Sequence, residues 1–176
     1  MPSKQQAGFN LIELMVALSV LGILVAVALP NFSQFIANTQ IRSTAESIRN
    51  GLQLARAEAV KRNAVVTFTL ANDTSWVVGC VGVNITANCP ANIQAKTANE
   101  GSSSTVTLAL TGPNTVSFTS LGIAVAGGLT QVIVDNSAIA AGQSKDLQVN
   151  IGVGGNTRVC DPNVAAVTDS RFCSAM

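Results

Sequence analysis

The sequence of 176 residues contains no histidine and no tyrosine, and only 11% of its residues are charged. Histidine is the commonest general base and a frequent metal ligand, so its absence removes the usual partner of a catalytic serine or cysteine. No paired spacing typical of acid–base catalysis connects the carboxylates of the later chain, which are Asp73, Glu100, Asp135, Asp146, Asp161 and Asp169. We therefore predict no catalytic residue and no cofactor.

Charge of either sign is scarce and nearly balanced. Ten basic and nine acidic side chains give a net charge of +1, and Lys4 is the one charge in the first eight residues. Losing that segment would leave the side chains neutral. A nucleic-acid-binding domain usually carries a strong basic field, so any contact with DNA would have to be local.

The N-terminal segment has what the rest of the chain lacks, a long apolar run. This run reaches Leu29 and contains one carboxylate, Glu13. A charged residue near the centre of a membrane costs several kcal/mol, so its presence there indicates a functional role. If the chain were cut after Gly8, the new amine of Phe9 would be a cation able to pair with Glu13 of a neighbouring copy.

This arrangement resembles the class III signal of type IV pilins and pseudopilins, in which Gly, Phe, Thr, Leu, Ile and Glu follow one another. Here Asn10 replaces the usual threonine. The resemblance implies that a prepilin peptidase cleaves between Gly8 and Phe9 and N-methylates Phe9, and that Glu13 acts in assembly. Gly22 and Pro30 match positions where pilin helices commonly loosen or bend, and we expect a helix break there.

Two simpler interpretations compete with this one. A secretory signal peptide could be cleaved at the small residues Ala26-Val27-Ala28, although Glu13 and the barely basic start disfavour it. A plain membrane anchor is the other, because residues 9–29 would extend about 31 Å as a helix, enough to span a bilayer. An anchor alone leaves Glu13 unexplained.

The chain divides into four segments. We predict a leader peptide at residues 1–8, a hydrophobic transmembrane and assembly helix at 9–30, an amphipathic helix at 31–63, and a β-rich head at 64–176. The two helical segments form one long helix that only Pro30 interrupts.

The second half of this helix has two distinct faces. A spacing of three and four residues makes one apolar stripe, formed by Ile41, Ala45, Ile48, Leu52, Ala55 and Ala59. Arg42, Arg49 and Arg56 recur every seven residues on another face. These arginines belong either to a solvated helix face or to contacts with neighbouring subunits in a filament.

From Ala64 onward the periodicity changes to two, which is typical of strands. The candidate strands are Val65 to Leu70, Trp76 to Val81, Val106 to Leu110, Val116 to Thr119, Gln131 to Val134 and Leu147 to Val153. We expect a loop at Ala91 to Ser104 and a return through Thr157 to Val159. The fold class is therefore α+β, a long N-terminal helix packed on an antiparallel β-sheet head, as in type IV pilins.

The head contains all four cysteines, Cys80, Cys89, Cys160 and Cys173. An even number in an oxidising compartment favours disulfides, and three pairings are possible. We favour Cys80–Cys89 and Cys160–Cys173, because each closes a local polar loop. A zinc site lacks both a Cys-x-x-Cys pair and histidine, so we predict no metal.

The helix at residues 41–66 and the segment from Phe118 to Gly122 resemble the FimT/FimU and GspH group of minor pilins and pseudopilins. The tail from Thr157 to Cys173 resembles FimT/FimU rather than the secretion-system GspH. The resemblance implies a minor pilin that helps initiate a type IV pilus or forms part of its tip. A GspH-like pseudopilin of a type II secretion system is an alternative. The implied partners are prepilin peptidase, other major and minor pilins, and the inner-membrane assembly platform. The protein would cross the bacterial inner membrane once, with its head in the periplasm, and reach the pilus surface after assembly.

The other alternative is a minor pilin that binds DNA during natural transformation. Some FimT-like proteins carry a Gly-Arg-x-Arg motif before the first tail cysteine, where this chain has Gly155-Asn156-Thr157-Arg158. The missing arginine removes one phosphate contact. Possible DNA contacts are then Lys145, Arg158 and Arg171, with Arg158 expected near the loop that Cys160–Cys173 closes.

Overall fold

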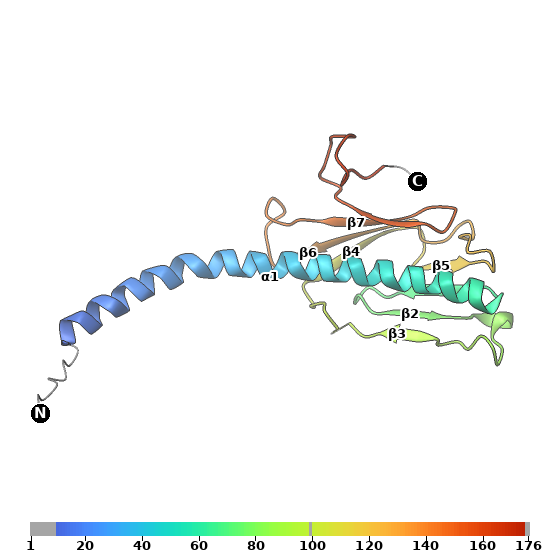
Figure 1. Ribbon diagram of the computed structural model, residues 1–176, viewed down its shortest axis with the longest axis horizontal. Helices are drawn as coiled ribbons and strands as arrows, with labels where there is room; N and C mark the ends of the chain where they lie inside the picture. Colours follow the sequence, from blue (N-terminus) through green and yellow to red (C-terminus); the bar gives the residue numbers. More distant parts are fainter. Residues whose placement is uncertain (1–9, 99, 175–176) are drawn as a thin grey trace, which may run out of the picture. The chain divides into compact units, whose positions relative to one another are not determined.

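The computed structural model describes residues 10–98 and 100–174. For residues 27, 28 and 30 it describes the backbone alone. The cleavage residues Gly8 and Phe9 lie outside this range. By the density of internal contacts the chain forms two units, Met1–Ile36 and Ala37–Met176. The first consists of the start of a single long helix, and the second of the rest of that helix with the β-rich head (Figure 1).

The helix α1 runs from Leu11 to Arg62 without interruption. The break expected at Gly22 and Pro30 is absent, and the backbone is helical at both positions. Proline removes a single N–H donor, and the residues on either side keep their own helical hydrogen bonds, so a proline does not have to end a helix. The helix ends where Asn63 takes a left-handed conformation, with φ of 50°, and Ala64 N donates to the Ala59 carbonyl.

The head contains two antiparallel sheets of four strands each, where the sequence indicated one sheet. The first has the order β3-β2-β1-β5, formed by Gln94–Lys96, Trp76–Gly79, Val66–Leu70 and Thr115–Phe118. The second has the order β4-β6-β7-β8, formed by Val106–Thr111, Gln131–Asn136, Leu147–Ile151 and Thr157–Cys160. Strand β3 lies inside the stretch expected to be a loop.

The core joins the helix to both sheets. The predicted apolar stripe of α1 is confirmed, since Ile41, Ile48 and Leu52 are fully buried. They share one cluster with residues of the first sheet, such as Phe68, and of the second sheet, such as Val134. In Figure 1 strands β6 and β7 appear on one side of α1, and β2 and β3 on the other. The fold class predicted from the sequence is therefore confirmed.

A short 3₁₀ helix, η1 (Gly82–Asn84), lies between β2 and β3 inside the loop closed by the Cys80–Cys89 disulfide. Arg62, at the end of α1, donates to the Asn88 carbonyl of the same loop and pairs with Glu58 at 2.6 Å. The disulfide and the arginine together connect the end of the helix to the first sheet.

We predict that Gly51→Ala destabilises the head by about 1–3 kcal/mol, the range for overpacking a core. A Cβ at Gly51 would lie 2.7 Å from Phe68 Cε2 and 3.1 Å from the Trp76 indole. Alanine ordinarily stabilises a helix relative to glycine by about 1 kcal/mol, so the sign of the effect is diagnostic. Urea unfolding in detergent, followed by the fluorescence of the single tryptophan, measures it.

The matched control is Gly142→Ala, because a Cβ there meets nothing within 4 Å. This variant should unfold within about 0.5 kcal/mol of the wild type. A Gly51→Ala variant as stable as the control would contradict the packing of the helix against Phe68 and Trp76.

Candidate functional site

Glu13 is in the first turn of α1 and is the only ionisable residue between Leu11 and Ile41. Its side chain is exposed. The N-terminal end of a helix carries a partial positive charge, which favours a carboxylate at this position. Glu13 is thus a single anion at the head of an apolar segment, free to meet a cation from outside its own helix.

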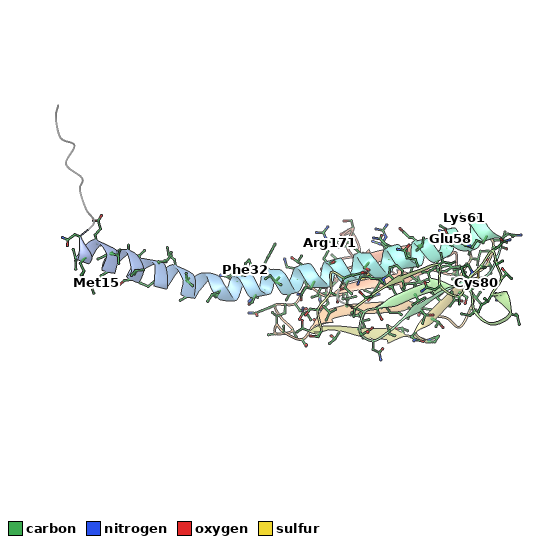
Figure 2. All side chains as sticks on the ribbon, turned by 90° about the horizontal axis from the view of Figure 1, so that it is seen from below. Met15, Phe32, Glu58, Lys61, Cys80 and Arg171 are labelled. Carbon is green, nitrogen blue, oxygen red and sulfur yellow. A yellow bond between two sulfur atoms is a disulfide. The ribbon has the colours of Figure 1, made fainter. Side chains whose placement is uncertain are left out.

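The first unit presents its apolar side chains to the surroundings. Met15 is 56% exposed and Phe32 is 61% exposed; both are labelled in Figure 2. The polar Ser19 satisfies its hydroxyl within the helix by donating to the Met15 carbonyl at 2.8 Å. Among the described residues, α1 is the one helix long and apolar enough to cross a membrane, and its most apolar window has a mean hydropathy of 2.6. Such a surface needs lipid or apolar protein around it.

The tail loop, residues 161–172, is closed by the disulfide between Cys160 and Cys173, whose Cα atoms are 5.1 Å apart. Asp161 N also donates to the Arg171 carbonyl at 2.8 Å. The two disulfides in the structure are the two that the sequence analysis favoured. Among the described residues there is no group of three or more acidic, cysteine or histidine side chains able to hold a metal ion.

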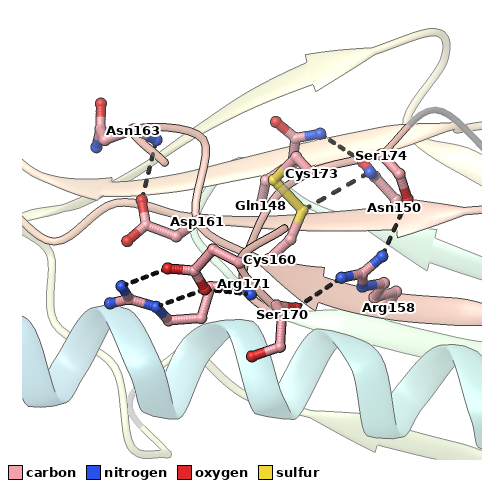
Figure 3. The surroundings of a disulfide bond; sticks show 11 residues. Gln148, Asn150, Arg158, Cys160, Asp161, Asn163, Ser170, Arg171, Cys173 and Ser174 are labelled. Atoms are coloured by element: carbon pink, nitrogen blue, oxygen red, sulfur yellow. Dashed lines mark hydrogen bonds and ion pairs between the residues drawn. A yellow bond between two sulfur atoms is a disulfide. The ribbon is translucent and has the colours of Figure 1, made fainter. Parts of the chain in front are cut away.

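Arg158 forms hydrogen bonds within the head, beside the tail loop, where the sequence predicted it to lie. Its guanidinium donates to the Ser170 carbonyl at 2.7 Å and to Ser174 Oγ at 2.9 Å (Figure 3). Both partners are uncharged, so no carboxylate offsets the arginine, and the two hydrogen bonds hold the C-terminal end of the tail loop and the residue after Cys173 to β8. In the view of Figure 3, Arg158 and Arg171 lie on opposite sides of the disulfide.

Arg171 is paired with Asp169, and the distance from Nη2 to Oδ2 is 2.9 Å. The hydrogen bonds from the Arg171 side chain and backbone lower the pKa of Asp169 to about 2. Three residues were predicted to contact DNA. Arg171 and Lys145 line the same groove, and Arg158 is not part of its lining.

This tail groove has a volume of about 480 Å³. It lies between α1, the β6–β7 loop (residues 137–146) and the tail. The charged residues along it are Arg42, Glu46, Arg49, Lys145, Asp161 and Arg171, and the remaining lining residues are Asn38, Leu147, Val159, Cys160 and Ser170. The spacing of seven residues placed Arg42 and Arg49 on one helix face, with solvation or contact with neighbouring subunits as the two interpretations, but it did not connect them with Lys145 or Arg171.

The β6–β7 loop is held in place by two sets of hydrogen bonds. Lys145 N donates to Asn38 Oδ1 at 2.8 Å, and Asn38 Nδ2 donates to the Gln143 carbonyl at 3.3 Å. Ser144 Oγ lies 2.5 Å from Oδ1 of both Asp135 and Asp146. A hydroxyl has one hydrogen, so the second of these contacts requires a proton on a carboxyl group.

The two carboxyl groups have opposite pKa shifts. The hydrogen bond from Ser144 lowers the pKa of Asp135, whereas burial raises the pKa of Asp146. The proton therefore resides on Asp146 in preference to Asp135. This small cluster fixes the position of Lys145 on the rim of the tail groove.

Comparison with known proteins agrees with these features. The family model described as type II transport protein GspH matches residues 44–155, and the prokaryotic N-terminal methylation motif matches residues 3–29. A fimbrial protein of Pseudomonas aeruginosa is 30% identical over 76 residues, which are 43% of this chain and 49% of that protein. The type IV major fimbrial protein FimA of Dichelobacter nodosus is 43% identical over 53 residues, 30% and 32% of the two chains. The chain thus spans half or less of these relatives.

Among solved structures, the type IV minor pilin FimU of Pseudomonas aeruginosa aligns with a TM-score of 0.52 and 18% identity, covering 71% of this chain and 91% of FimU. The long helix, the two-sheet head and the methylation motif define a type IV pilin or pseudopilin. Within that class the chain belongs to the GspH family, whose model matches more than half of it. The family predicted from the sequence is confirmed.

We predict that Asp146→Asn stabilises the protein at neutral pH by about 1 kcal/mol, the size of a typical hydrogen bond. The raised pKa of Asp146 means that the folded state binds a proton more tightly than the unfolded state. That contribution to the free energy of unfolding is present at acidic pH and is lost as the pH rises through the folded-state pKa. Asparagine stays uncharged and does not lose this contribution as the pH rises. The stability gained by the variant should therefore disappear below pH 3.8, the ordinary pKa of aspartate, where Asp146 is protonated in both states.

Asp135→Asn is the opposite case. The lowered pKa of Asp135 contributes stability above the ordinary pKa, which is lost as the pH falls through the folded-state value. This variant should be less stable than the wild type at neutral pH. Urea titrations between pH 3 and pH 7 compare the two, and shifts of the same sign in both variants would rule out the shared-proton arrangement.

Proposed function

We propose that this chain is a minor pilin, a structural subunit that helps start a type IV pilus or forms part of its tip. The observation that carries the proposal is Glu13, the only ionisable residue in the exposed apolar part of α1, which lies within the methylation motif at residues 3–29. A purely lipid-facing anchor gains nothing from a carboxylate, which is costly to place in a membrane. A helix that packs among identical or similar helices can use it.

In this proposal a prepilin peptidase cuts between Gly8 and Phe9 and methylates the new amine. The methylated amine stays cationic and pairs with Glu13 of a neighbouring subunit. Because an unpaired charge is expensive in an apolar filament core, only the correctly registered arrangement satisfies both groups. The pair would therefore set the axial position of one subunit relative to the next.

The chain would wait in the bacterial inner membrane with its head in the periplasm and pass into the filament through the assembly platform. Its partners would be other major and minor pilins. The exposed apolar residues between Leu11 and Ile36 suit both stages, since lipid and neighbouring helices are equally apolar surroundings.

A pseudopilin of a type II secretion system is the second candidate, favoured by the match to the GspH family. Binding of DNA is less well supported. Arg158 is engaged by Ser170 and Ser174, and Arg171 is paired with Asp169, so Lys145 alone of the three proposed contacts has no side-chain partner among the described residues. With no strong net charge, few phosphate contacts would give weak binding that salt removes.

A deletion strain tests the proposed function when it is scored separately for surface pili, secretion of folded proteins and transformation. We expect loss of pili, restored by the wild-type gene. Loss of secretion with normal pili would assign the chain to a secretion system instead. Loss of transformation alone would assign it a DNA-receptor role.

We further predict that Glu13→Ala lowers incorporation into pili at least about tenfold while membrane insertion is retained or improved. Removing a carboxylate makes insertion easier but leaves the amine of a neighbour without its partner. The measurement is the amount of protein in the sheared surface fraction relative to the membrane fraction. Ser19→Ala, a neutral change on the same apolar segment, is the control, and equal incorporation of both variants would contradict the role of Glu13.

A further inference from the structure

We propose that the tail groove is a docking site for an extended acidic segment of a neighbouring subunit, one that alternates carboxylate and apolar side chains. The identity of the partner as a subunit depends on the proposed function. The chemistry of the segment does not, because it follows from the residues that line the groove.

The charge of the groove is positive and partly unpaired. Four cations line it, Arg42, Arg49, Lys145 and Arg171, against the two carboxylates Glu46 and Asp161. Among the described residues, Arg49 and Lys145 have no ionic partner. With Asp169, which pairs with Arg171 from outside the lining, the local balance is four cations against three carboxylates, a surplus equal to the net charge of +1 of the whole chain.

The existing ion pairs along the groove are weak enough to exchange. Arg42 pairs with Glu46 at 2.9 Å, but the two side chains are 75% and 54% exposed. Arg171 pairs with Asp169 while remaining 67% exposed. Exposed pairs of this kind contribute little to stability, so the side chain of either arginine can turn to a carboxylate delivered by a partner.

The floor of the groove is apolar. Leu147 and Val159 are half-buried and pack against the hydrophobic core, and Cys160 beside them is buried in its disulfide. A small anion would leave this floor unused. A peptide in extended conformation places alternate side chains on opposite sides, so acidic residues can reach the rim while apolar residues cover Leu147 and Val159.

The walls of the groove are already fixed. The β6–β7 loop is tied to α1 through Asn38, and the tail loop is held by the Cys160–Cys173 disulfide and by Arg158. A groove that is preformed does not lose affinity to the ordering of loops. The backbone of the three chain segments that carry the cations is thereby held in position around one floor.

The same lining argues against nucleic acid as the occupant. A phosphate backbone carries repeated negative charge and no apolar side chains. It would meet Glu46 and Asp161 inside the groove and leave Leu147 and Val159 uncovered. An acidic peptide can position its few carboxylates at Arg49 and Lys145 and avoid both anions.

Binding is tested with the full chain in detergent and a fluorescent heptapeptide in which Asp and Leu alternate, blocked at both ends. We expect saturable binding by fluorescence anisotropy, at least about tenfold weaker for the double variant Arg49→Gln with Lys145→Gln, since charge-assisted contacts are among the stronger ones. Lys61→Gln is the control, because Lys61 is 71% exposed but lies outside the groove. A peptide with Asn in place of Asp should bind as weakly as the double variant does.

Three results would overturn the proposal: no binding of the Asp–Leu peptide, equal binding by the double variant, or tighter binding of a short DNA duplex that the same double variant loses. The last of these would make the groove a nucleic-acid site. Thermal unfolding of each variant, followed by Trp76 fluorescence, confirms that the head remains folded.

A second measurement tests the partner. The double variant should enter the sheared pilus fraction less than the Lys61→Gln control at equal membrane levels. Equal incorporation would refute docking of a subunit in the groove. Absence of the wild-type chain from pili would instead overturn the proposed function, whereas the peptide titration would still decide whether the groove binds an acidic segment.

Discussion

Burial of one stripe of α1 is the interaction on which the head depends. Ile41, Ile48 and Leu52 have no exposed surface, and they belong to one core cluster with residues from both sheets. Each fully buried aliphatic side chain contributes about 1.5–3 kcal/mol. Neither four-stranded sheet covers its own apolar face, so the helix supplies the shared core. The disulfides and loops then fix the edges of a structure that this packing has already arranged.

The same helix meets the opposite condition before Ala37. There the large apolar side chains that the structure describes are exposed, from Leu11 to Ile36, and Glu13 is the one charged residue of this part of the helix. The second half of this continuous helix packs against the head of its own chain. The first half exposes apolar side chains, which lipid or another protein would have to cover. In the function proposed here, this chain divides a single element between folding and assembly.

The pattern of the sequence predicted the parts of the fold that depend on local periodicity. The stripe from Ile41 to Ala59 recurs every three or four residues, strands β4, β5 and β6 alternate in burial, and the two disulfides close short loops. The separation into two sheets was not visible, because strand pairing depends on contacts between distant segments. Strand β3 was missed because Gln94–Lys96 is short, lies at a sheet edge and buries none of its side chains fully.

The candidate sites divide in the same way. Glu13 could be found from the sequence, since a lone carboxylate in an apolar run stands out without a structure. The tail groove could not, because it joins Arg49 of the helix to Lys145 and Arg171, roughly a hundred residues further along the chain. Arg158 was placed correctly near the tail loop, but only the structure shows that Ser170 and Ser174 occupy its guanidinium.

We propose above all that proteolysis after Gly8 makes Phe9 the first residue of the mature chain, and that the apolar half of α1 then acts in assembly. The intact mass of the protein extracted from the cell envelope tests this most directly. The account predicts a chain that begins at Phe9 and carries one added methyl group on its N-terminal amine. A chain that still begins at Met1, or one that begins at Leu29 after signal-peptide cleavage, would contradict it.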